Sequence, residues 1–89
     1  MKSAANPRFW RLYNALPESI RRQADKAYRL WLNDPFHGGL QFKRIHAERA
    51  IYSARIPRDW RALGIMRDDG IVWFWIGSHS DYDRLISRL

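Results

Sequence analysis

Basic side chains gather in the middle of the sequence, and most of the sixteen Lys and Arg residues are Arg. Residues 41–61 hold six basic and two acidic residues, whereas residues 68–83 hold four Asp and no Lys or Arg. A guanidinium can bind two phosphate oxygens at once and can stack on a nucleobase. The candidates for binding phosphate or RNA are Lys43, Arg44, Arg55 and Arg58. We therefore predict a surface that meets a polyanion or an acidic protein.

The available residue types limit the chemistry that this surface could perform. The chain has no Cys, so it has no thiol nucleophile, thiolate zinc site or disulfide. His37 and His46 lack the partner spacing of a metal site and are interpreted as surface residues. RNA can be cleaved without a metal if the 2′-hydroxyl is activated, the phosphate charge is neutralised and the leaving oxygen is protonated. Arg, His and Tyr can fill these roles, so we expect no metal and no other cofactor.

Length and composition indicate what kind of chain must position such residues. The 89 residues are 46% hydrophobic, include thirteen aromatic residues and carry a net charge of +7. This is enough apolar material for one core, so we expect a single domain over residues 1–89. No stretch reaches the roughly 18 apolar residues of a membrane span, and the first twenty residues contain no apolar signal core. We therefore expect a cytoplasmic protein with no membrane contact.

Two helices are expected in the first third of the chain. Asn6 can cap a helix that begins at Pro7. The apolar residues of this helix recur at helical spacing: Phe9, Leu12, Tyr13 and Leu16. Pro17 ends this helix and begins a second one, which Asn33-Asp34-Pro35 stops. The apolar face of the second helix holds Ile20, Ala24, Ala27 and Trp31. The sequence thus predicts an N-terminal helical hairpin.

After Gly39 the hydrophobic period changes to about 2, which predicts strands. We expect strands at 40–45, 51–56, 60–67 and 71–76, with a turn at 68–70. The last strand is apolar on both faces, so we expect it inside the sheet, with the helices over one face and cover or a ligand over the other. Ser78 can cap a short C-terminal helix. The predicted fold is α+β: the helical hairpin packs on a twisted antiparallel sheet of three to four strands.

Six short pieces of sequence, in this order and spacing, resemble the RelE/ParE toxin superfamily. They are Leu16-Pro17-Glu18, Asn33-Asp34-Pro35, Phe42-Lys43, Tyr52-Ser53-Ala54-Arg55, Trp60-Arg61-Ala62-Leu63 and Trp75-Ile76-Gly77-Ser78-His79-Ser80-Asp81-Tyr82. The resemblance covers residues 7–86 and implies the toxin half of a type II toxin–antitoxin pair. Family members of the RelE kind cleave mRNA on the ribosome, and those of the ParE kind inhibit DNA gyrase. The resemblance favours a metal-independent, RelE-like endoribonuclease.

The resemblance also implies roles for three residues as catalytic candidates. Arg61 matches the Arg that binds the scissile phosphate, His79 the residue used for proton transfer or phosphate contact, and Tyr82 the stacking or acid Tyr. Each has a structural alternative. Arg61 could pair with an Asp, His79 could cap a helix, and Tyr82 could pack in the core. Arg55, a possible second phosphate contact, could instead lie on a solvated strand face.

Two features depart from the family pattern and keep other functions open. Residues 1–6 show no alternating apolar pattern, so the edge strand that precedes the hairpin in RelE-like chains is expected to be missing. The family's Lys pair is replaced by Ser53-Ala54-Arg55. A gyrase inhibitor, or a degenerate member that binds without cleaving, are therefore the alternatives. The expected partners are an acidic antitoxin, whose helix could cover the basic face, and RNA on the ribosome, with DNA gyrase as the alternative target.

Overall fold

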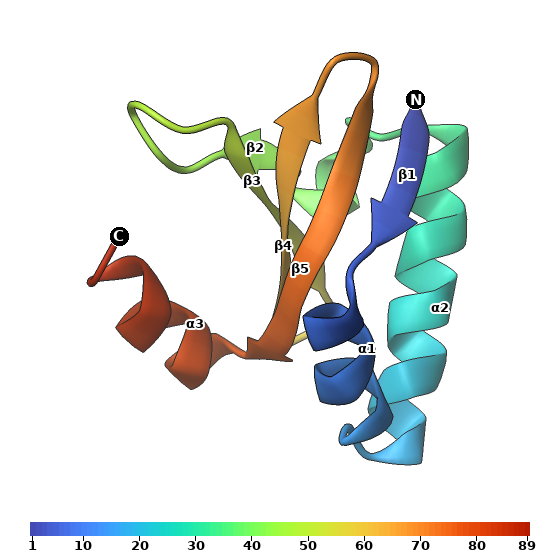
Figure 1. The fold of residues 1–89 in the computed structure, drawn as a ribbon. Coiled ribbons are helices and arrows are strands. Elements are labelled where there is room, and N and C mark those ends of the chain that lie inside the picture. Colours follow the sequence, from blue (N-terminus) through green and yellow to red (C-terminus); the bar gives the residue numbers. More distant parts are fainter.

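The computed structural model describes residues 1–89, which form three α-helices and five strands (Figure 1). In chain order, the elements are β1 (Lys2–Ala5), α1 (Pro7–Asn14), α2 (Glu18–Asn33), the short 3₁₀ helix η1 (Gly38–Leu40), β2 (Lys43–Arg44), β3 (Ile51–Ile56), β4 (Trp60–Arg67), β5 (Gly70–Ser78) and α3 (His79–Ile86). In Figure 1, α1 and α2 lie together on one side of the sheet and α3 lies on the other. The α+β layout predicted from the order of hydrophobic periods is confirmed.

The helical hairpin begins and ends where its local residues predict. The Oδ1 atom of Asn6 accepts a hydrogen bond of 2.9 Å from the backbone N–H of Phe9, and Pro7 takes the first helical position. Pro17 is the N-cap of α2, and Asp34 is its C-cap. Both helices turn an apolar face to the sheet, where Ala24 and Trp31 are buried. No helix in the structure has the length and apolar character needed to cross a membrane.

The sheet has five strands, in the order β1-β5-β4-β3-β2. The expectation of a missing N-terminal strand is wrong, because β1 pairs in parallel with β5, from Lys2 opposite Gly70 to Ala5 opposite Trp73. The other three pairings are antiparallel. β1 is held by backbone hydrogen bonds, so it needs no alternating apolar pattern. Gly70 allows the close approach, since a Cβ atom there would lie 2.7 Å from the Lys2 carbonyl oxygen.

The strand predicted over residues 40–45 is shorter than expected. Leu40 belongs to η1, and Gln41 has a left-handed backbone with φ of 44°. Only Lys43 and Arg44 remain as β2. Leu40 and Phe42 are nevertheless both buried, as the apolar members of an alternating pattern would be. The turn through η1 buries them instead of a continuous strand, and sequence alternation alone cannot distinguish the two.

A bulge explains why β5 is apolar on both faces. Leu63 pairs with Trp75, but its neighbour Gly64 pairs with Trp73, so Phe74 is the extra residue. The bulge places Trp73 in the cluster under α1 and α2 and Trp75 in the cluster on the opposite face. That second cluster contains Ile51, Leu63, Trp75 and Tyr82. The predicted need for cover on the second face is therefore met in part by α3, through Tyr82.

Candidate functional site

Three basic residues share the face of the sheet that α3 partly covers. Lys43 of β2 pairs with Ser53 of β3, and Arg55 of β3 pairs directly with Arg61 of β4. Side chains alternate along a strand, so Arg55 lies on the same face as Ser53. Ser53 pairs in turn with Leu63, whose side chain belongs to the cluster beneath α3. Lys43, Arg55 and Arg61 therefore lie on one face, and three adjacent strands position them.

Arg61 is held against the end of its own strand and against α3. One of its terminal nitrogens, Nη1, donates to the Trp60 carbonyl oxygen at 2.9 Å and to the Arg58 carbonyl oxygen at 3.5 Å. The guanidinium carbon lies 5.9 Å from the centre of the Tyr82 ring, which is a cation–π distance. These contacts hold the charge near the first residue of β4, the middle strand of the sheet, without neutralising it.

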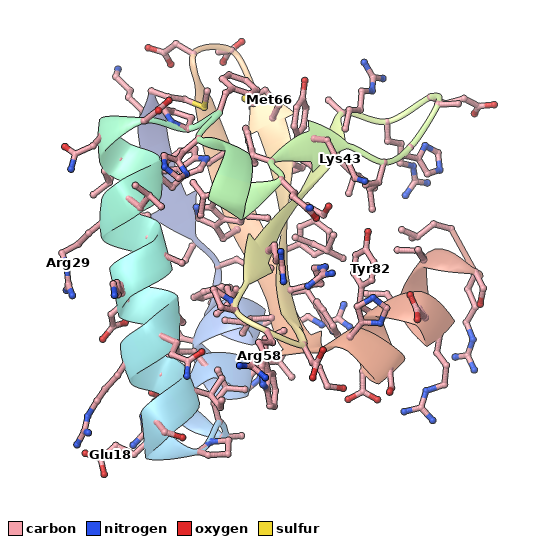
Figure 2. The ribbon with its side chains drawn as sticks, turned by 180° about the vertical axis from the view of Figure 1, so that it is seen from behind. Glu18, Arg29, Lys43, Arg58, Met66 and Tyr82 are labelled. Atoms are coloured by element: carbon pink, nitrogen blue, oxygen red, sulfur yellow. The ribbon has the colours of Figure 1, made fainter.

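Tyr82 is both a core residue and a wall of this site. Its side chain is 8% exposed, and its ring lies 6.5 Å from that of Trp75. The hydroxyl makes no hydrogen bond within the protein. Figure 2 shows Tyr82 projecting from α3 beside the sheet. The ring is thus fixed by packing, while the hydroxyl is left without a protein partner.

His79 begins α3 next to Tyr82. Its backbone N–H donates to the Asp59 carbonyl oxygen, which ties the start of α3 to the β3–β4 connection. Its Nδ1 atom lies 3.0 Å from Oδ2 of Asp83, and its ring centre lies 6.1 Å from that of Tyr82. A carboxylate on one ring nitrogen fixes the orientation of the imidazole and leaves the other nitrogen free to exchange a proton. Asp83 was missed from the sequence, although its i+4 spacing from His79 on a helix was a usable signal.

The charges of this site are not neutralised by neighbouring carboxylates. The ion pairs of the protein join Lys2 to Asp69, Arg22 to Glu18, His79 to Asp83 and Arg84 to Asp81. None of them involves Lys43, Arg55, Arg58 or Arg61. Like charges placed directly opposite each other on neighbouring strands are destabilising. The pair formed by Arg55 and Arg61 therefore costs stability in the free protein, and a bound anion would relieve that cost.

Two predicted phosphate-binding residues lie apart from this group. Arg44 pairs with Tyr52, so it lies on the opposite face from Lys43. Its guanidinium donates to the carbonyl oxygens of His46 and Ala47, which braces the β2–β3 loop. Arg58 is exposed in the β3–β4 connection (Figure 2). Its carbonyl oxygen accepts a hydrogen bond from Arg61. The group on the sheet therefore consists of Lys43, Arg55 and Arg61, with Arg58 at its margin.

The other histidines form no metal site. The Nδ1 atom of His37 accepts from the Gly39 N–H, and that of His46 accepts from the N–H groups of Glu48 and Arg49. Each imidazole thus shapes a turn. No group of three His, Asp or Glu side chains in the structure is arranged to bind a metal ion.

Comparisons with known proteins identify a family model and solved structures that are similar to this chain. The model of the ParE-like toxin domain matches residues 18–84. A search of curated protein sequences finds no match. YafQ from E. coli strain BL21(DE3) is similar in structure, with a TM-score of 0.72, 10% identity, and coverage of 91% of this chain and 96% of that chain.

Two further structures agree with that result. The crystal structure of the RelB-RelE antitoxin-toxin complex from Methanococcus jannaschii matches with a TM-score of 0.72 and 18% identity, over 91% of this chain and 96% of that chain. The YoeB/ParE toxin from Agrobacterium tumefaciens matches with a TM-score of 0.69 and 15% identity, over 89% of this chain and 99% of that chain. Similarities at these identities show the fold. Because the family model spans most of the sequence, the chain belongs to the ParE-like toxin domain family, within the RelE/ParE superfamily that its motifs resemble.

Proposed function

We propose that this chain, as one domain over residues 1–89, is the toxin of a type II toxin–antitoxin pair and cleaves mRNA on the ribosome without a metal. The observation that carries the proposal is the direct pairing of Arg55 with Arg61, which no carboxylate neutralises. A stable sheet gains nothing from this pair. Violations of local stability rules are expected where a protein binds or reacts, and guanidiniums carried by two paired residues can bind the oxygens of one phosphodiester.

The proposed chemistry assigns one task to each group around this pair. The 2′-oxygen of the RNA attacks phosphorus while the bond to the 5′-oxygen breaks. Arg61 and Arg55 stabilise the charge on the five-coordinate phosphate. His79, oriented by Asp83, accepts the proton of the attacking 2′-hydroxyl. The free hydroxyl of Tyr82 donates a proton to the leaving 5′-oxygen; if Tyr82 only forms the edge of a stacking surface, His79 passes its proton on to that oxygen. Lys43 and Arg58 bind neighbouring phosphates, and Arg44 supports the adjacent loop.

The test compares wild type, Arg61→Ala and Arg29→Ala in a translation-dependent mRNA cleavage assay. Arg29 is an exposed residue of α2 with no side-chain hydrogen bond or ion pair, so it controls for the loss of one positive charge. We expect Arg61→Ala to lower the cleavage rate about 10²-fold to 10³-fold. This is the typical effect of removing one hydrogen-bond donor that stabilises the transition state of an enzyme. Arg29→Ala should cleave like wild type. Equal cleavage by all three proteins would refute the assignment of Arg61.

A second candidate function is the inhibition of DNA gyrase, because the family model that matches is that of the ParE-like toxin domain. In that case binding through surface complementarity replaces cleavage. The discriminating result is inhibition of gyrase supercoiling by purified protein that leaves translated mRNA intact. A protein with neither effect would be a degenerate member that only binds a partner.

The proposed protein partner is an acidic antitoxin. We place both proteins in the cytoplasm. Structures similar to this chain include the RelB-RelE complexes from Methanococcus jannaschii and Pyrococcus horikoshii OT3. The net charge of +7 suits an acidic helix that covers the unpaired Arg side chains. Such a partner would block RNA and relieve the Arg55–Arg61 repulsion together.

A further inference from the structure

A groove lies on the same face of the sheet as Arg61, toward the other end of β4. Its floor is apolar, because Ile51, Ile65 and Val72 pair with one another across β3, β4 and β5 and so share that face. Phe74 lies beside them. In Figure 1, α3 lies at the lower end of β5, whereas the β2–β3 loop and the β4–β5 turn lie at the upper end. α3 therefore covers only part of this face, and Ile65, Val72 and Phe74 remain partly exposed.

Two arginines line this groove without an acidic partner. Arg49 belongs to the β2–β3 loop, Arg67 is the last residue of β4, and both are exposed. Neither takes part in an ion pair. The acidic residues next to them in the sequence, Glu48 and Asp68, do not line the groove. The groove therefore presents uncompensated positive charge beside an apolar floor, and it is called the Arg49–Arg67 groove below.

This combination of groups favours one class of occupant. Two separate cations beside aliphatic side chains complement a peptide segment that carries apolar residues between two carboxylates. RNA is a poorer match, because Phe74 is the only ring in the groove on which a base could stack. The groove has a volume of about 400 Å³. An apolar cavity of about 150 Å³ holds benzene, so the groove has room for two aliphatic side chains.

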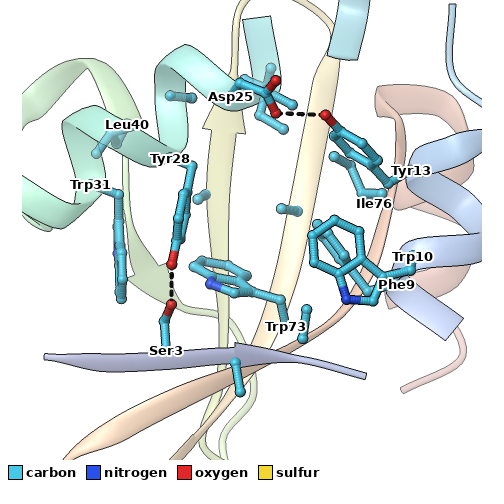
Figure 3. A pocket seen from close by; sticks show the side chains of 17 residues that line it. Ser3, Phe9, Trp10, Tyr13, Asp25, Tyr28, Trp31, Leu40, Trp73 and Ile76 are labelled. Atoms are coloured by element: carbon cyan, nitrogen blue, oxygen red, sulfur yellow. Dashed lines mark hydrogen bonds between the residues drawn. The ribbon is translucent and has the colours of Figure 1, made fainter. Parts of the chain in front are cut away.

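The cavity on the opposite side of the sheet offers no comparable charge. It opens between β1, α1 and α2, and 15 of its 17 lining residues are hydrophobic (Figure 3). Figure 3 shows that its hydroxyl and carboxylate groups bond to one another, Tyr13 to Asp25 and Ser3 to Tyr28. No Lys or Arg lines it. An acidic segment is therefore expected at the Arg49–Arg67 groove and not at this cavity.

We propose that the Arg49–Arg67 groove binds an acidic segment of a partner protein, with apolar side chains on its floor and one carboxylate at each arginine. The inference rests on the proposed function only in naming the antitoxin as the protein that supplies the segment. Arg67 lies about 20 Å from Arg61 along β4, at the rise of an extended strand. The segment would therefore anchor a partner beside the cleavage site without itself filling that site.

The test is a titration of the full chain, labelled with ¹³C in its methyl groups, followed by nuclear magnetic resonance. The probe is the blocked peptide acetyl-Glu-Leu-Leu-Glu-amide. One control peptide replaces each Glu by Gln, a second replaces each Leu by Ser, and tetrauridylate represents RNA. We expect the probe to shift the methyl signals of Ile65 and Val72 and to leave that of Ile56, in the core under α1 and α2, in place.

The control peptides separate the two contributions to binding. Two exposed ion pairs together contribute about fivefold to affinity, so the Gln peptide should bind about fivefold more weakly than the probe. Burial of two leucines contributes more, so the Ser peptide should bind at least about tenfold more weakly. Tetrauridylate should leave the signals of Ile65 and Val72 in place.

Variants assign the charge to the two arginines. The double change Arg49→Gln and Arg67→Gln should weaken binding of the probe about fivefold and remove its advantage over the Gln peptide. Both side chains are exposed, so the variant should fold normally. Arg29→Gln, at an exposed position of α2, removes the same charge elsewhere and should bind like wild type. The titration contains no mRNA, so its outcome does not depend on whether the protein cleaves.

Four results would overturn the proposal. They are an absence of shifts at Ile65 and Val72, equal binding of the Glu and Gln peptides, wild-type binding by the double variant, and stronger binding of tetrauridylate than of the probe at the same signals. The last result would assign the groove to RNA. The double variant should also cleave mRNA like wild type, because neither arginine belongs to the proposed cleavage site.

Discussion

At Tyr82, removing one atom, the hydroxyl oxygen, separates the proposed catalytic role of the side chain from its packing role. Its ring is buried against Trp75 and Arg61, while its hydroxyl has no hydrogen-bond partner in the protein. Tyr82→Phe removes only the hydroxyl, and Tyr82→Ala removes the ring as well. If the proposed role is correct, the first change should impair cleavage without affecting folding, and the second should impair both.

The expected stabilities follow from burial. Truncation of a buried aromatic side chain to Ala costs about 4 kcal/mol. In an 89-residue domain this corresponds to a fall in Tm of roughly 20 °C. Tyr82→Phe breaks no hydrogen bond within the protein, so its free energy of unfolding should stay within about 0.5 kcal/mol of wild type. The two variants thus differ widely in stability while both lack the hydroxyl.

The assays are urea unfolding and single-turnover mRNA cleavage on translating ribosomes. A hydroxyl that donates a proton to the leaving oxygen contributes about 10²-fold to 10⁴-fold to the rate, so Tyr82→Phe should lose that factor. Tyr52→Phe is the matched control, because Tyr52 lies on the opposite face of the sheet and its hydroxyl makes no hydrogen bond. Full cleavage by Tyr82→Phe would refute the catalytic role and leave Tyr82 as a packing residue. A stability loss above about 1 kcal/mol in that variant would contradict the reasoning about its hydroxyl.

Two further predictions concern the fold. In Gly64→Ala the new Cβ would lie 2.6 Å from two side-chain carbons of Ile71 and 3.0 Å from Trp73, and both residues are buried. The free energy of unfolding, measured in urea, should therefore fall by about 1–3 kcal/mol. An unchanged midpoint would mean that the bulge adjusts freely. The hydrogen bond to Asp25, with desolvation and the charge of Asp25, raises the pKa of Tyr13 above 10.0. The folded state therefore favours the protonated phenol, and this stabilisation is complete below the unfolded pKa and is lost as pH rises through the folded pKa. The difference in free energy of unfolding between wild type and Tyr13→Phe should stay constant below about pH 9 and shrink as the pH rises above 10.0, and a difference that stays constant there would contradict the shift.

The helices were predictable because their ends depend on local chemistry. Asn6, Pro7 and Pro17 act within one turn of the chain, through a cap hydrogen bond and a fixed φ. The strands β3 and β4 were also predicted with their observed bounds, since their alternation reflects one buried face. Local rules are sufficient wherever the stabilising partner is near in sequence or the burial is periodic.

β1 and β2 were mispredicted because their determinants are remote or conformational. β1 is defined by backbone pairing with β5, some 68 residues further along the chain, and its side chains carry little of that information. β2 is shortened by the left-handed backbone of Gln41, a residue type with no marked preference for that conformation. The bulge at Phe74 is a similar case, since it shows only when β4 and β5 are paired.

Some features of the candidate site also follow from local sequence, and others depend on the tertiary structure. That Arg55 shares a face with Ser53 follows from alternation, but the neighbour of Arg55 across the sheet is set by the β3–β4 pairing, which begins at Ile56 opposite Trp60. The proximity of Tyr82 to Arg61 depends on how α3 folds back over β4 and β5, which no local pattern encodes.

The limited packing of α3 on the sheet bears on how a partner could inhibit the site. α3 contributes Tyr82 and His79 and contacts the sheet through far fewer residues than β4 and β5 share with each other. Elements with few buried contacts open at lower free energy than the core strands. A partner that displaced α3 would remove both proposed proton-transfer groups and leave Arg55 and Arg61 in place on the sheet. An antitoxin that covers only the Arg pair would instead block RNA binding and leave α3 docked, so hydrogen exchange of α3 in the complex distinguishes the two modes of inhibition.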